Sequence, residues 1–164
     1  MSHGTTTAII AAASALSGVA LSQAITLFRE ALNRKHQRRI LLREKYEEMG
    51  LSFLISLKHY TELQEIKDPK QLFRYAQNFE ANKCYLLCDL YFSVIRDNAL
   101  SYVLAYVEVY KTFALASSAL DGEKCLAEIA ANTEAYRQNK LSYEKAKIAL
   151  EKAISINAVN YTKS

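Results

Sequence analysis

The chain has 164 residues, of which 51% are hydrophobic and 23% charged, and its formal net charge is +4. This composition excludes general disorder, and four Gly and one Pro are too few for a protein built from many short strands. Because good helix formers occur throughout, we predict an all-α fold. In it, an N-terminal helix continues into a long-helix antiparallel bundle or coiled coil of three to four helices.

The first expected helix covers residues 5–28, TTTAIIAAASALSGVALSQAITLF, which include no charged side chain. At about 1.5 Å per residue it would be about 36 Å long, and a bilayer core is about 30 Å thick. We therefore predict that residues 1–28 are a transmembrane anchor. Small residues recur at every fourth position at Ser14, Gly18 and Ser22, which predicts close helix–helix association.

Basic residues follow this segment directly. Residues 29–45 contain seven Lys/Arg and two Glu, a net charge of +5, which leaves the rest of the chain at −1. A basic cluster on one side of an apolar segment favours the cytoplasmic face, so we predict a single pass through the inner (cytoplasmic) membrane with the C-terminal body in the cytoplasm. Anionic lipid headgroups are the expected ligands, at about 1 kcal/mol per side chain. The expected headgroup contacts are Arg29, Arg34, Lys35, Arg38, Arg39 and Arg43.

Nucleic acid is a less suitable partner for this basic run. No aromatic residue is interleaved with it, and no helix-turn-helix or zinc spacing surrounds it. The alternative to a lipid-bound anchor is a soluble cytoplasmic helix buried between protomers.

Residues 29–67 are expected to form one helix with a buried stripe at steps of three and four. The stripe consists of Leu42, Tyr46, Met49, Phe53, Leu57, Tyr60 and Leu63. The helix should stop near Lys67, because Asp68 is a good N-cap and Pro69 suits the first position of a new helix.

Residues 68–157 are expected to form a helical hairpin or bundle, followed by a frayed tail at 158–164. A break at Asn78 or at Asp97–Asn98 is possible, because short polar side chains compete for backbone hydrogen bonds. Asp121–Gly122 predicts a second stop, and one helix should then cover 123–157. In that helix Ile129, Tyr136, Tyr143 and Leu150 are spaced by seven, as in a coiled coil.

Two features within 68–157 invite a chemical interpretation. Tyr102, Tyr106 and Tyr110 form a stripe that we interpret as core and boundary packing, and Asp89 is expected to be buried with a partner.

The three cysteines, an odd number, indicate a reducing compartment. Cys84 and Cys88 are separated by four residues and have no histidine nearby in sequence, which predicts buried thiols and not metal ligands.

No Gly-rich phosphate loop, catalytic triad, zinc spacing or paired-carboxylate signature is present in the sequence. We therefore predict no catalytic, cofactor-binding or metal site and no enzymatic activity. The predicted function is that of a small membrane-anchored helical protein that acts through protein–protein interaction or self-association. A soluble oligomeric adaptor or structural subunit is the first alternative, and a membrane-perturbing pore protein is the second.

Overall fold

The computed structural model describes residues 3–75, 79–119 and 123–162, with the side chains of these residues except 3–17, 20 and 162. All regular structure in these ranges is helical, which confirms the all-α fold class. The elements are α1 (His3–Gln64), α2 (Pro69–Leu72), η1 (Phe73–Tyr75), α3 (Phe79–Tyr91), α4 (Ser93–Ala116), η2 (Ser117–Ala119), α5 (Leu126–Ala130) and α6 (Glu134–Thr162).

The chain divides into two compact units, Met1–Leu41 and Leu42–Ser164. The first unit consists of the N-terminal part of α1. The second unit contains the rest of α1 and all later helices, and it holds the hydrophobic core.

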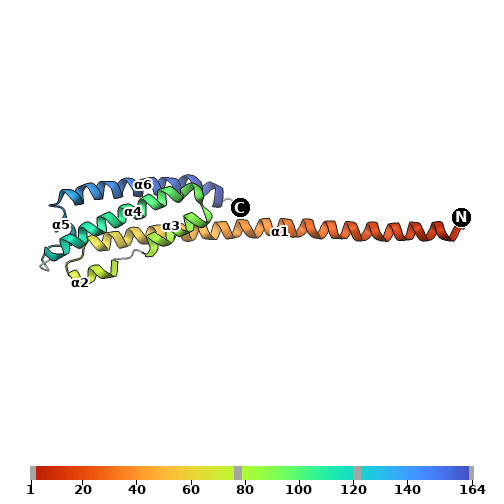
Figure 1. The fold of residues 1–164 in the computed structure, drawn as a ribbon, viewed down its shortest axis with the longest axis horizontal. Coiled ribbons are helices and arrows are strands. Elements are labelled where there is room, and N and C mark those ends of the chain that lie inside the picture. Colours follow the sequence, from red (N-terminus) through yellow and green to blue (C-terminus); the bar gives the residue numbers. More distant parts are fainter. Residues whose placement is uncertain (1–2, 76–78, 120–122, 163–164) are drawn as a thin grey trace. The chain divides into compact units, whose positions relative to one another are not determined.

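The core of the second unit is built on three long helical segments, residues 42–64 of α1, α4 and α6, and α3 and α5 add further buried side chains. Figure 1 shows α4 and α6 side by side in this unit, where they make an extensive contact. Ring contacts pair Tyr46 with Phe92 and Tyr60 with Tyr106, so α1 and α4 run in the same direction. Contacts of Tyr46 with Tyr161, and of Tyr60 with Tyr143, show that α6 runs antiparallel to them.

The buried stripe expected on α1 is confirmed in the second unit, with two additions, Ser52 and Ser56. Tyr46, Met49, Phe53, Tyr60 and Leu63 are buried, and Leu42 and Leu57 are partly buried. Ser56 is fully buried, and its hydroxyl is satisfied there: it donates to the carbonyl of Phe53 at 2.6 Å and lies 2.8 Å from the Tyr102 hydroxyl. A polar residue thus occupies a core position that we expected only apolar side chains to fill.

The boundary expected at residues 67–70 is confirmed. The α1 helix ends at Gln64, and Asp68 is the N-cap of α2 with Pro69 as the first helical residue. The Asp68 carboxylate accepts a hydrogen bond from the backbone N–H of Lys70 at 3.0 Å, which satisfies one of the free donors at the helix start.

The break in the middle of the chain differs from the expectation. Asp97 and Asn98 lie inside α4, whereas α3 and α4 are separated at Phe92, which has φ −134° and ψ 60°; residues 76–78, which include Asn78, lie outside the described part. The Phe92 ring is 1% exposed and contacts the rings of Tyr46 and Tyr161 at 5.2 and 4.8 Å. Burial of this ring in the core favours the break where local propensity predicts a continuous helix.

The helix expected over residues 123–157 is also divided. Thr133 ends the turn after α5, and its hydroxyl accepts from the backbone N–H of Tyr136 at 3.3 Å near the start of α6. The α6 helix then continues to Thr162, beyond the point where a frayed tail was expected, because Tyr161 stacks on Tyr46. Asp121–Gly122 lies outside the described residues.

Candidate functional site

The six expected headgroup contacts are all solvent-exposed residues of α1. Arg29, Arg34, Lys35, Arg38 and Arg39 belong to the first unit, whereas Arg43 belongs to the second. At about 100° per residue, they lie on several sides of the helix. This arrangement makes no pocket for a single anion, but it suits a ligand that surrounds the helix, such as a layer of headgroups.

Intramolecular ion pairs neutralise only part of this charge. Arg34 lies 3.9 Å from Glu30, and the Arg43 side chain donates to Glu47 at 2.9 Å, each one helical turn along α1. Within the described residues the structure shows no ion pair for the other four, Arg29, Lys35, Arg38 and Arg39. Their charges are therefore available to an external anionic partner.

The small residues of the predicted association stripe are not brought against another helix where the structure describes them. A Cβ atom built on Gly18 would meet no atom within 4 Å. Ser22 is exposed, and its carbonyl accepts from the Thr26 hydroxyl at 3.0 Å within the same helix. The side chain of Ser14 lies outside the described part of the structure.

Within the described residues, no helix is long and apolar enough to cross a membrane. The transmembrane part of the predicted fold is thus not confirmed. Side chains 5–17 and 20 of the predicted span lie outside the described set.

A small pocket of about 250 Å³ lies between α1 and α6 in the second unit. Its walls are Leu57, Tyr60, Thr61, Gln64, Lys140, Tyr143, Glu144 and Lys147. Lys147 pairs with Glu144 at 2.7 Å, and burial raises the pKa of both Tyr60 and Tyr143. These phenols stay protonated at neutral pH, so the pocket offers hydrogen bonds and one additional ammonium group but no strong nucleophile or base.

A chain of buried hydroxyls lies next to this pocket. The Tyr102 hydroxyl is 2.8 Å from that of Ser56 and 3.3 Å from that of Tyr143, which joins α1, α4 and α6. Tyr102 and Tyr106 are buried and Tyr110 is partly buried, which confirms the packing interpretation of this stripe. The period-seven tyrosines of α6 indicated the burial of Tyr143, but no sequence signal marked Ser56.

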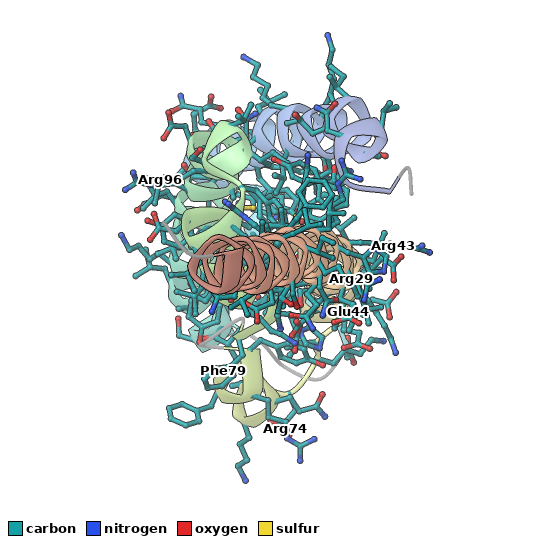
Figure 2. The ribbon with its side chains drawn as sticks, turned by 90° about the vertical axis from the view of Figure 1, so that its right-hand side faces the viewer. Arg29, Arg43, Glu44, Arg74, Phe79 and Arg96 are labelled. Carbon is teal, nitrogen blue, oxygen red and sulfur yellow. The ribbon has the colours of Figure 1, made fainter. Side chains whose placement is uncertain are left out.

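Two further expectations concern single side chains. Cys84 and Cys88 are buried thiols, as predicted. Asp89 is not buried, which corrects the expectation. Its side chain is 38% exposed and pairs with Arg96 at 2.8 Å on the outside of the α3–α4 hairpin, where Figure 2 shows Arg96. Within the described residues, no group of three His, Cys, Asp or Glu side chains is placed to hold a metal ion.

No protein-family model, curated protein or solved structure matches this chain. The basic surface of α1 is an exposed helical segment, next to an uncharged one, in which four cations have no ion pair within the described residues.

Proposed function

We propose that this chain is a small single-pass membrane-anchored helical protein that acts through protein–protein interaction or self-association. Residues 5–28 would cross the inner membrane, the basic side chains from Arg29 to Arg43 would bind anionic headgroups, and the bundle would lie in the cytoplasm. No catalytic step is part of this proposal.

One observation carries the proposal: the sharp change in charge at Phe28–Arg29. An uncharged segment ends there, and the next eleven positions of α1 include five exposed cations, of which four have no ion pair in the described structure. A soluble helix normally carries charge along its wet face, whereas a membrane helix places cations just beyond its cytoplasmic end.

The test is extraction of membranes from cells that express the full chain. An integral protein stays in the membrane after a wash with alkaline carbonate, whereas a peripheral protein is released. We expect retention of the full chain and its loss when residues 5–28 are deleted. Recovery of the full chain as a monodisperse species in the soluble fraction would contradict the proposal.

A soluble oligomer remains the second candidate, and a specific observation favours it. Leu21, Ile25, Leu27, Phe28 and Leu32 are 47–66% exposed, an apolar surface that water does not solvate well. In a soluble protein these side chains would be buried between protomers. The third candidate, a pore, differs from both because it predicts leakage of dye from liposomes.

A further inference from the structure

The exposed apolar side chains of the first unit include a regular seam. Gly18, Leu21, Ile25, Phe28 and Leu32 follow one another at steps of three, four, three and four. The four apolar side chains are 64%, 47%, 66% and 52% exposed. Steps that alternate between three and four place residues on one narrow face of a helix, the pattern of a coiled coil.

The same spacing continues through the sequence without an interruption of the heptad. After Leu32 it passes Lys35 and Arg39 and then reaches the buried side of α1 in the second unit. The positions there are Leu42, Tyr46, Met49, Phe53, Ser56, Tyr60 and Leu63. All but the partly buried Leu42 are at most 6% exposed, because α4 and α6 cover them. In the second unit this heptad is thus already an interface with other helices.

We propose that the face from Gly18 to Leu32 pairs with the same face of a second copy of this chain, as a parallel two-stranded coiled coil. A heptad seam fits into the side of another helix. In the second unit, the long helices α4 and α6 already pack on each other and on that unit's part of α1. We therefore assign the partner of the seam to another chain. A second copy supplies an identical uncovered face, so both seams are buried at once, as in symmetric dimers.

The residues of the seam favour the parallel two-stranded form. With Gly18 at position a, Leu21 and Phe28 fall at d, and Ile25 and Leu32 at a. The central pair, Leu21 at d and Ile25 at a, is the combination that parallel dimers prefer. Gly18 is uncovered and has no side chain, so a second backbone can approach closely there. The next seam positions, Lys35 and Arg39, would place like charges opposite each other, so the seam ends after Leu32.

The inference names the partner in the self-association that the proposed function includes. It does not depend on membrane insertion, because the seam can form in lipid, detergent or water. Failure of the carbonate test and failure of the pairing test below are therefore separate results.

Cysteine crosslinking of the full chain tests the pairing, with Leu27 as the matched control. Leu27 is 62% exposed and adjoins Phe28, but it lies outside the seam. In a Cys125→Ser background, which removes the partly exposed native thiol, we expect Ile25→Cys to form a disulfide-linked dimer under mild oxidation. Leu27→Cys should form about tenfold less, because disulfides require Cβ atoms about 4 Å apart.

Equal crosslinking at the two positions, or none at Ile25→Cys, would overturn the proposal. A crosslink found only when Ile25→Cys and Phe28→Cys copies are mixed would overturn the parallel arrangement. Sedimentation of the unoxidised chain is the second measurement: we expect Phe28→Glu to be monomeric and Leu27→Glu to remain dimeric, whereas a dimeric Phe28→Glu chain would refute the seam.

Discussion

At the scale of single residues, the packing of the core helices depends on tyrosines whose rings are buried and whose hydroxyls need hydrogen-bond partners. Tyr102 illustrates this: its ring contacts Phe53 at 5.3 Å, and its hydroxyl lies between those of Ser56 and Tyr143. A buried hydroxyl without a partner is costly, so the three hydroxyls stabilise one arrangement of α1, α4 and α6.

We expect Tyr102→Phe to lower the free energy of unfolding by about 1–2 kcal/mol, because the Tyr143 hydroxyl loses its partner. The control is Tyr91→Phe, a residue that is 37% exposed and whose change should cost less than about 0.5 kcal/mol. Urea unfolding followed by circular dichroism measures both. Equal losses of unfolding free energy in the two variants would show that the buried hydroxyl of Tyr102 stabilises the fold no more than the exposed hydroxyl of Tyr91 does.

Tyr46 gives a prediction about alkaline pH. Burial, and secondly the nearby Tyr161, raise the pKa of Tyr46 from 10.0 to about 12, and its hydroxyl donates to the carbonyl of Ile154. Because the folded state favours the protonated phenol, this contribution to stability is complete below about pH 10 and declines as pH rises towards about pH 12.

The free energy of unfolding should therefore fall between about pH 10 and about pH 12, and Tyr46→Phe should make that decline shallower. Tyrosinate absorbance recorded during the same titration identifies the ionisation. A variant with the unchanged pH profile would mean that Tyr46 does not contribute to it.

At the scale of elements, the junction between α3 and α4 shows how packing competes with propensity. Phe92 interrupts what would otherwise be one helix, and its backbone N–H still donates to the Cys88 carbonyl at 2.9 Å. Its ring fills a site formed with Tyr46 and Tyr161, which come from the two other core helices.

Phe92→Ala should lower the free energy of unfolding by about 3–5 kcal/mol, because it leaves a cavity where three helices meet. Phe79, at the start of α3, is 71% exposed and provides the comparison. Phe79→Ala should change stability by less than about 0.5 kcal/mol. If chemical denaturation finds the two variants equally stable, the Phe92 ring is not what stabilises the break.

At the scale of the whole molecule, the proposed activity depends on charge that is concentrated at one place in the chain. Residues 29–45 carry +5 and the rest carries −1, so the preference for anionic over zwitterionic surfaces should come from this segment. Screening by salt should weaken that binding.

Arg29→Gln combined with Arg38→Gln removes two cations that have no ion pair in the described structure. We expect affinity for vesicles containing anionic lipid to fall about 30-fold, with no change for zwitterionic vesicles. Lys145→Gln combined with Lys152→Gln removes the same charge from exposed positions of α6 and should have little effect. Flotation measures the binding of each double variant to each kind of vesicle. An equal loss of affinity for anionic vesicles in both double variants would refute a localised lipid contact.

Features that rest on local chemistry are predictable from the amino-acid sequence. Helix-forming composition determined the all-α class, Asp68–Pro69 the boundary after α1, and three- and four-residue steps most of the buried face of α1. The concentration of charge after Phe28 is likewise a property of the sequence. These signals are readable because the interacting groups lie within one or two helical turns of each other.

Other features follow from contacts between distant parts of the chain. The break at Phe92 and the burial of Ser56 depend on contacts with Tyr46, Tyr161 and Tyr102, which are distant in sequence. Long-range packing stabilises such arrangements by more than the local preferences that oppose them, and no window of sequence contains both partners.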